Sequence, residues 1–430
     1  MTIFLLPLAF VALFIFLLRQ SGSLQVPGLS GRYLQLLFLI KSFTGIFITY
    51  IGIHILEPTD MLGFFHSGQK FFQLLKSDPV LFFRIFIGIE DQSAEPFLNT
   101  IGGWFVYVWD AGLNDNRIII RINALISFLS NGNIYVHSVF FSFLSTLGMI
   151  FLLKSVSKII NNRNLIHAVI ALTFLPGLLC WTSIISKESL VIFLIGTLLY
   201  SFQVFLKNSK NKLNTFLLLL TLLTFSFSRV YVLLLLMPSL IAWTYCHFRK
   251  VKKSGIVFLI VHLVSISSLI IAGEINPKYN PTWIIYQRQM TFMQYTAEVL
   301  PDTRISLPAP EYTYSNLIKR IPGAFLNPLI HPGFHELKNI FLIPFFLENI
   351  LLILFLLFLV YRIRRVKDSP LNWTALWFLA GLFILIGLTI PMSGLLIRLR
   401  VPALLLIIFP LVQNFTKAGN LPDPHAEKRN

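Results

Sequence analysis

The chain has 430 residues, of which 56% are hydrophobic and only 12% are charged. Because a soluble domain carries roughly 25% charged residues, this chain cannot cover a globular surface with polar side chains. The net charge of +17 does not indicate a nucleic-acid-binding protein, because the basic residues form short clusters between apolar runs and no nucleic-acid-binding motif accompanies them. The composition therefore predicts an all-α integral membrane protein.

Long apolar runs occur along the whole chain. A spanning helix needs about 20 mostly apolar residues. About eleven runs meet this requirement, which predicts a single polytopic membrane domain over 1–430. The first run has no basic residue before it, which is typical of a retained helix and not of a cleaved signal peptide. The runs are 2–18, 33–55, 134–153, 165–181, 188–206, 213–228, 230–247, 255–272, 341–361, 371–390 and 394–413.

The basic clusters fix the predicted orientation. They fall on one side of the membrane when the runs alternate, and by the positive-inside rule that side is cytoplasmic. We therefore expect a multi-pass protein of the inner or plasma membrane, with its N-terminus outside and a short cytoplasmic tail at 414–430. The bases that lead to this prediction are Arg19, Arg32, Lys154, Lys158, Arg163, Lys207, Lys210, Lys212, Arg249, Lys250, Lys252, Lys253, Arg362, Arg364, Arg365, Lys367, Lys417, Lys428 and Arg429.

Two long segments, 56–133 and 273–340, are predicted to lie at the outer face. Long loops between short ones are where binding and catalytic residues concentrate. Within the first segment, 61–77 and 117–130 repeat apolar residues at helical spacing. This pattern predicts helices that lie along the membrane interface with one face in lipid.

Four basic residues stand at the outer ends of apolar runs, against the positive-inside trend: Lys187, Arg229, Arg398 and Arg400. Ionisable groups at membrane depth are costly and mark functional sites, and Lys41 is a fifth such base within a run. Arginine binds phosphate bidentately and lysine binds it as a point charge. The four bases therefore predict a site for the phosphate of a lipid carrier. The alternative is that they extend to lipid headgroups or pair with carboxylates.

Asp60 emerges directly after an apolar run, at the expected outer boundary of the membrane. A carboxylate there can accept a proton from an attacking hydroxyl, as a general base does. The alternative is that Thr59 or Asp60 caps the helix that follows. Further along, Trp181 fits an interfacial aromatic belt, and Glu188 is expected to begin a helix and neutralise Lys187. The alternative is that Glu188 and Lys187 form a purely structural ion pair.

Metal and nucleotide sites are not expected. His331 and His335 have helical i, i+4 spacing beside Glu336, but Pro332 and Gly333 between them favour a turn over a metal-binding helix. Motifs of nucleotide-binding loops, zinc peptidases and serine hydrolases do not occur in a usable context. We therefore predict no cofactor, although the sequence leaves divalent-metal dependence open.

The order of these features resembles the C-type (GT-C) polytopic membrane glycosyltransferases and related polysaccharide polymerase-like membrane proteins. A spanning helix runs into an outer loop that bears Asp60 and interfacial helices. The segments PGLLCWTSIISKES (176–189), SRVYVLLLLMP (228–238) and IRLRVPALLLIIFP (397–410) follow in the order seen in that superfamily.

The resemblance implies an inverting glycosyltransferase that uses a polyprenyl-phosphate sugar in the outer leaflet. Asp60 would activate a hydroxyl of a glycan, lipid or protein acceptor, and the four bases would hold the donor phosphate. Trp181, Glu188, Arg121 and Arg304 would support the site. Phosphate is a weak base as a leaving group, so fixed positive charge can replace the acid that glycoside hydrolysis uses.

Three other functions stay open. An oligosaccharide-repeat polymerase, of the kind that builds O-antigen or exopolysaccharide, would depend more on arginines of the second outer segment, such as Arg288 and Arg304. A transporter of lipid-linked glycans predicts paired charges at the midplane and two homologous halves. Only Lys41 is suited to such a midplane charge, and no internal repeat is visible. A non-enzymatic assembly subunit would tolerate the loss of Asp60 together with the bases.

Overall fold

The computed structural model describes residues 2–56, 59–105, 116–157, 160–299, 301–361 and 368–415. Over these residues the chain is helical, and the only extended pairing is an isolated bridge between Arg304 and Met392. The prediction of an all-α protein is therefore confirmed for the described part. Lys158, the basic cluster at 362–367 and the basic residues of the tail lie outside it.

Eight helices in the described residues are long and apolar enough to cross a membrane, as expected of an α-helical membrane protein. A ninth span results if α19 (Ser393–Leu399) and α20 (Val401–Phe415), which meet at a bend of 53°, are counted together. The eight are α1 (Thr2–Gln20), α2 (Gly31–His54), α8 (Ile134–Val156), α11 (Lys187–Lys207), α13 (Val230–Arg249), α14 (Ser254–Ile275), α17 (Ile343–Tyr361) with the turn before it, and α18 (Pro370–Thr389).

Two other predicted spans take shorter forms. The run at 165–181 is divided into α9 (Asn162–Phe174) and α10 (Pro176–Trp181). The division falls at Leu175, whose backbone is extended because the proline that follows disfavours a helical conformation there. The run at 213–228 forms α12 (Lys212–Ser228), which is apolar but only 17 residues long. The count of eleven spans therefore stays a prediction.

By its internal contacts the chain divides into two units. Unit 1 comprises Met1–Ser157, Leu172–Phe174 and Leu178–Leu233, and unit 2 comprises Lys158–Ala171, Leu175–Gly177 and Leu234–Asn430. Each unit is described below by itself.

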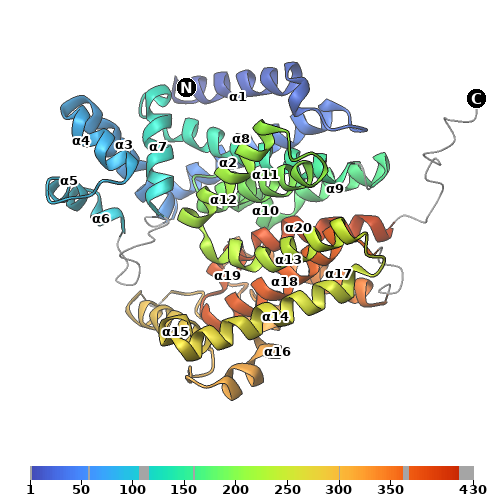
Figure 1. Ribbon diagram of the computed structural model, residues 1–430. Helices are drawn as coiled ribbons and strands as arrows, with labels where there is room; N and C mark the ends of the chain where they lie inside the picture. Colours follow the sequence, from blue (N-terminus) through green and yellow to red (C-terminus); the bar gives the residue numbers. More distant parts are fainter. Residues whose placement is uncertain are drawn as a thin grey trace, which may run out of the picture. The chain divides into compact units, whose positions relative to one another are not determined.

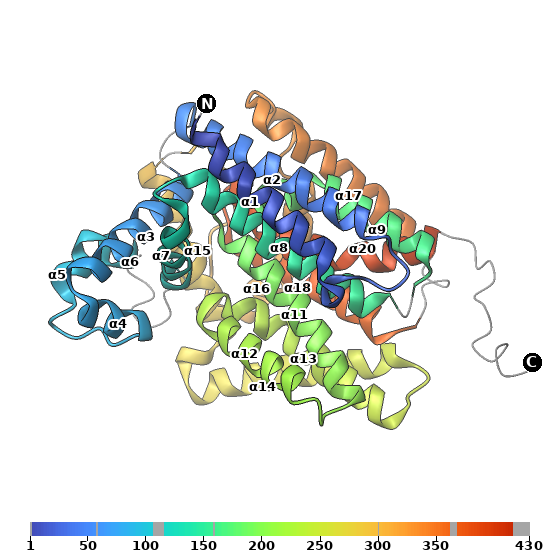
Figure 2. The ribbon, with the colours of Figure 1, turned by 90° about the horizontal axis from the view of Figure 1, so that it is seen from above.

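In unit 1, α2, α8, α11 and α12 lie side by side (Figures 1 and 2). The closest approach is between α8 and α11, where a Cβ atom added to Gly196 would lie 1.9 Å from the carbonyl oxygen of Gly148. Small residues allow helix backbones to touch, and such contacts replace the hydrophobic effect as the driving force for packing inside a membrane. The two glycines therefore set the spacing of the central helix pair.

The predicted interfacial segments are helical: they form α3 (Asp60–Ser77) and α7 (Asn116–Ser130). Figure 2 shows α3, α4 (Pro79–Ile87), α5 (Glu95–Thr100) and α6 (Gly102–Phe105) gathered beside α7. The prediction that the apolar face of 61–77 enters lipid is wrong for Phe64, Phe65 and Phe71, which are at most 5% exposed. Two amphipathic helices bury each other's apolar stripes instead, and Gly68 of α3 lies directly against Asn123 of α7.

In unit 2, α18 is the central helix and contacts α14, α15 (Pro281–Val299), α16 (Tyr314–Ile330) and α20. The second predicted outer segment, 273–340, is thus largely helical. Here too a glycine allows close packing, since a Cβ atom on Gly387 of α18 would lie 1.8 Å from the carbonyl oxygen of Ala324 in α16. Single turns of 3-10 helix complete the chain at Gly22–Leu24, Pro277–Tyr279, Phe334–Glu336 and Ile340–Leu342.

Candidate functional site

Asp60 is the first residue of α3 and is exposed. Thr59 occupies the N-cap position, but its side chain makes no capping hydrogen bond, so the hydroxyl of Thr59 does not cap the helix as the alternative interpretation expected. A carboxylate in the first turn is stabilised by the positive end of the helix dipole. The helix start therefore holds an accessible carboxylate directly after the spanning helix α2.

Lys187 is the first residue of α11 and meets α3 through Phe64. Its Nζ atom lies 5.8 Å from the centroid of the Phe64 ring, within the range of a cation–π interaction. Phe64 is four residues after Asp60, and residues with this spacing share one face of a helix. The fold therefore brings a predicted phosphate-binding lysine against a residue that is one helical turn from the predicted base.

Glu188, next to Lys187, forms an ion pair with Arg229. Nη2 of Arg229 lies 3.1 Å from Oε1 of Glu188, and the two side chains are 15% and 3% exposed. The guanidinium also lies over the ring of Tyr231, at 5.7 Å from its centroid. The sequence predicted an ion pair of Glu188 with Lys187, whereas the structure pairs Glu188 with Arg229. We call Asp60, Phe64, Lys187, Glu188 and Arg229, all in unit 1, the Asp60 cluster.

The start of α11 is fixed by a buried turn. Trp181 ends α10, and the five residues Thr182–Ser186 separate it from α11. The hydroxyl of Ser186 donates to the carbonyl oxygen of Trp181 at 2.6 Å and accepts from the backbone N–H of Ser189 at 3.1 Å. This N-cap satisfies a helix-end donor and so fixes the backbone that carries Lys187 and Glu188.

Arg121, predicted to support the site, holds α7 against neighbouring helices of unit 1. Its Nη2 donates to the carbonyl oxygen of Ile85 at 2.8 Å and lies 3.7 Å from the carboxylate of Glu90. The guanidinium also stacks over the ring of Trp104 at 4.8 Å. Burial lowers the pKa of Arg121, and the Glu90 carboxylate opposes this shift. These contacts tie α7 to α4 and α6, which is a structural role.

Arg398 and Arg400 belong to unit 2. Arg400 is completely buried, with Nη2 at 2.7 Å from Oε1 of Glu348 and Nη1 donating to the carbonyl oxygen of Pro328 at 2.6 Å and to Asn349. Glu348 in turn accepts a hydrogen bond from the backbone N–H of Gly177 at 2.6 Å. The guanidinium of Arg400 is thus held inside the protein. Arg398, on α19, is only half-buried.

Arg304 is exposed and lines a hollow of about 320 Å³, together with Ser306 and Pro391. Two backbone hydrogen bonds attach this loop to the start of α19: Ile305 N–H donates to Pro391 O at 2.9 Å, and Ser393 N–H donates to Thr303 O at 2.8 Å. The loop therefore presents a cation beside the helix that bears Arg398. Arg288 is exposed on α15 in the same unit.

His331 and Glu336 form a pair. The Nδ1 atom of His331 lies 2.8 Å from Oε2 of Glu336, which also accepts from the N–H of Gly333 at 2.6 Å, whereas His335 is 76% exposed. Burial would raise the pKa of Glu336, but hydrogen bonds from His331, Ser393 and Gly333 outweigh it and lower the pKa. Among the residues described, no three ligands gather into a metal-binding group.

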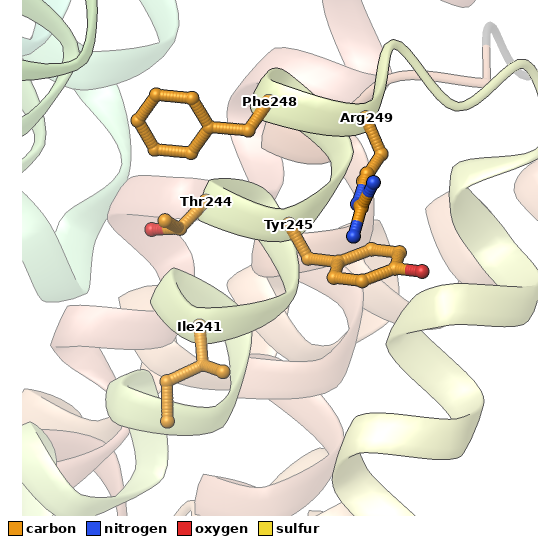
Figure 3. A pocket seen from close by; sticks show the side chains of 5 residues that line it. All are labelled: Ile241, Thr244, Tyr245, Phe248 and Arg249. Atoms are coloured by element: carbon orange, nitrogen blue, oxygen red, sulfur yellow. The ribbon is translucent and has the colours of Figure 1, made fainter.

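A second hollow, of about 380 Å³, lies along the surface of α13 (Figure 3). Its lining consists of Ile241, Thr244, Tyr245, Phe248 and Arg249. Figure 3 shows the Tyr245 ring and the Arg249 side chain on one side of the helix and Phe248 on another. Exposed aromatic and basic side chains at the end of a spanning helix suit the membrane interface. The lining holds no carboxylate that could act as a general base.

Compared with models of known protein families, with curated proteins and with solved structures, the chain matches none of them. The site is therefore argued from geometry. Sequence reasoning missed Phe64 as the link between Asp60 and Lys187, because that link depends on tertiary packing. It also missed Glu348, although an acid inside the apolar run 341–361 is a usable signal of a buried partner.

Proposed function

We propose that this protein is a membrane glycosyltransferase that moves a sugar from a polyprenyl-phosphate donor to an acceptor at the outer face of the membrane. The observation that carries the proposal is the contact between Lys187 and Phe64, one helical turn from Asp60. A base and a cation carried by neighbouring helices suit a reaction in which a hydroxyl loses a proton while a phosphate gains negative charge.

In the proposed reaction, the acceptor hydroxyl gives its proton to the Asp60 carboxylate while its oxygen forms a bond to the anomeric carbon of the sugar. The bond from that carbon to the phosphate oxygen breaks, and its electron pair leaves with the phosphate. Attack from the face opposite the phosphate inverts the anomeric carbon. Lys187 stabilises the charge on the departing phosphate, and the ion pair of Glu188 with Arg229 holds the start of α11 that carries it.

The proposed topology has about eleven spans, an outer N-terminus and a cytoplasmic tail. In this topology the protein lies in the inner or plasma membrane, and segments 56–133 and 273–340 lie at its outer face. Support comes from the order of the elements: α2, an apolar helix long enough to span a membrane, ends at His54, and α3 begins at Asp60, so the proposed base would lie at the boundary of a span. Lipid-linked donors have their phosphate at this depth, so the donor could reach the Asp60 cluster by diffusing within the bilayer.

A second candidate is an oligosaccharide-repeat polymerase. One observation favours it: Arg304 lines a hollow, and the loop that carries Arg304 is hydrogen-bonded to the start of α19. A polymerase would bind a pyrophosphate-linked glycan there through Arg304, and Asp60 would not be needed. Arg304→Met would then shorten glycan chains without loss of any single sugar.

The test of the proposed function is a comparison of lipid extracts from wild-type and deletion strains by mass spectrometry. The transferase proposal predicts that the deletion strain accumulates one polyprenyl-phosphate-linked sugar, or the acceptor that lacks it. Accumulation of complete repeat units on a pyrophosphate carrier would overturn it in favour of the polymerase. An unchanged set of lipid-linked sugars would contradict both.

A further inference from the structure

The break between α10 and α11 is an unusual element for the interior of a helical bundle. Its five residues, Thr182–Ser186, are not helical, and none of them is more than 8% exposed. In a membrane protein, backbone carbonyl groups outside a regular helix must find partners within the protein. The partners of this break therefore show what holds it in place.

Three side chains from two other helices reach the break. The Nζ atom of Lys41, on α2, donates to the carbonyl oxygen of Thr182 at 3.1 Å and also contacts the hydroxyl of Thr182. On α8, Ser145 donates to the same carbonyl at 2.6 Å, and Ser142 donates to the carbonyl of Ser183 at 2.8 Å. The break is thus tied to the rest of unit 1 through one ammonium group and two hydroxyls.

The backbone of α2 also touches the break. A Cβ atom on Gly45, one turn along α2 from Lys41, would lie 2.1 Å from the carbonyl oxygen of Ser183. Only glycine leaves room for this approach. The amino group of Lys41 therefore reaches Thr182 from a helix that is already in contact with the break.

Lys41 is 0% exposed, and no carboxylate in the described residues forms an ion pair with it. A buried charge is costly unless polar groups surround it, and ionisable residues inside membrane helices serve a function by default. Here the polar groups are the oxygens of the break. The amino group of Lys41 and the oxygens of the break thus supply each other's polar partners.

The break and α2 each precede a part of the Asp60 cluster in the sequence. Lys187 and Glu188 follow the break directly, and α2 ends shortly before Asp60. A contact between α2 and the break therefore couples the segment that bears the base to the segment that bears the cation.

We propose that Lys41 is a positioning residue, which holds the break so that Lys187 stands over Phe64 beside Asp60. This role rests on the proposed function, because it assigns Lys41 to the same site. Removal of the ammonium group takes one of two side-chain donors from the Thr182 carbonyl, which keeps only Ser145, and lets the start of α11 shift. Small displacements of this kind reduce catalysis by roughly 100-fold.

A native cysteine allows the position of the break to be tested without any substrate. Cys180 lies two residues before the break and is half-buried, and Cys246 is the only other cysteine. In the full-length protein carrying Cys246→Ala, the rate of N-ethylmaleimide labelling reports the exposure of Cys180. We expect Lys41→Met to raise this rate by at least about tenfold, because the break loosens.

Two control variants accompany the labelling experiment. Lys41→Arg keeps the charge and donors, and Lys154→Met removes a lysine elsewhere in unit 1 that donates to the carbonyl of Ser23. Both should label at nearly the wild-type rate. If Lys41→Met does not fold, the milder Ser142→Ala/Ser145→Ala double variant removes two of the ties and should show the same increase. Wild-type labelling in folded Lys41→Met protein, or in the double variant, would overturn the proposal.

The same variants are then compared for glycan transfer in cells. We expect Lys41→Met to lose transfer and Lys41→Arg to restore it, at matched protein levels. Raised labelling with intact transfer would overturn the link to the site. If Asp60→Asn and Lys41→Met both leave glycans unchanged while labelling rises, the proposed function fails but the contact of Lys41 with the break stands.

Discussion

The Nζ atom of Lys187 lies 5.8 Å from the ring centroid of Phe64, which stands one helical turn from Asp60. Phe64 thus links Asp60, the predicted general base, to Lys187, a predicted phosphate-binding group. They come from α3 and α11, which are far apart in the sequence. The account of function depends on this contact, and the first prediction tests it.

Lys187→Met should reduce glycan transfer by roughly 100-fold to 1,000-fold, the usual cost of removing one group that stabilises transition-state charge. Lys76→Met is the matched control, because Lys76 also lies over a phenylalanine ring of α3, at 5.1 Å from the centroid of Phe72. Transfer is measured as labelled sugar that reaches the acceptor fraction of membranes. Equal activity of the two variants would show that Lys187 contributes only a packing contact.

Arg400→Met should lower the free energy of unfolding by about 3–5 kcal/mol, because it leaves Glu348 buried without its charged partner. Arg304→Met, at an exposed position of the same unit, should change the free energy of unfolding by less than about 1 kcal/mol. Chemical denaturation in detergent micelles measures both. A double variant, Arg400→Met with Glu348→Gln, should be more stable than Arg400→Met alone. An Arg400→Met protein as stable as wild type would contradict the buried ion pair.

The contact between His331 and Glu336 should weaken in acid. Because the pKa of Glu336 is lowered in the folded protein, its ionised form contributes stability above the ordinary value of 4.5, and this contribution is lost as pH falls through the folded pKa. Hydrogen exchange of the Gly333 amide, which donates to Glu336, reports the change. Glu336→Gln should remove this acid dependence of protection, and an unchanged dependence in that variant would contradict the assignment.

Gly196→Val should prevent the close packing of α8 and α11, because any Cβ atom would overlap the backbone of Gly148. We expect loss of the monodisperse peak in size-exclusion chromatography. Gly31→Ala is the control, since nothing lies within 4 Å of a Cβ atom at Gly31. A monodisperse Gly196→Val protein with wild-type thermal stability would contradict this helix contact.

Much of the fold could be predicted from apolar runs, because a run of about 20 apolar residues has few structures available in lipid. The helices at 61–77 and 117–130 were likewise predictable from their period. Their burial was not, because an amphipathic stripe does not reveal whether lipid or another helix covers it. Phe71 is 0% exposed only because neighbouring helices of unit 1 cover it.

The candidate site was predictable in part. Asp60 was expected at a helix start, and it begins α3. The sequence could not show that the Glu188 carboxylate pairs with Arg229 or that Arg400 is sealed against Glu348. Such pairings join residues from different helices, so they follow from tertiary structure and not from local pattern. A buried lysine that holds a helix break, as Lys41 does, has no local signature beyond its place in an apolar run.

The most direct test of the central claim compares surface and lipid-linked glycans in cells that carry Asp60→Asn or Asp78→Asn at matched protein levels. Asp78 is an exposed carboxylate of the same segment, 56–133, and it caps α4 through the backbone N–H of Leu81, a role that asparagine also fills. We predict that Asp60→Asn loses one sugar from the surface glycan and accumulates its lipid-linked donor, whereas Asp78→Asn keeps the wild-type profile. A wild-type profile for Asp60→Asn would contradict the assignment of Asp60 as the base and, with it, the proposed transferase.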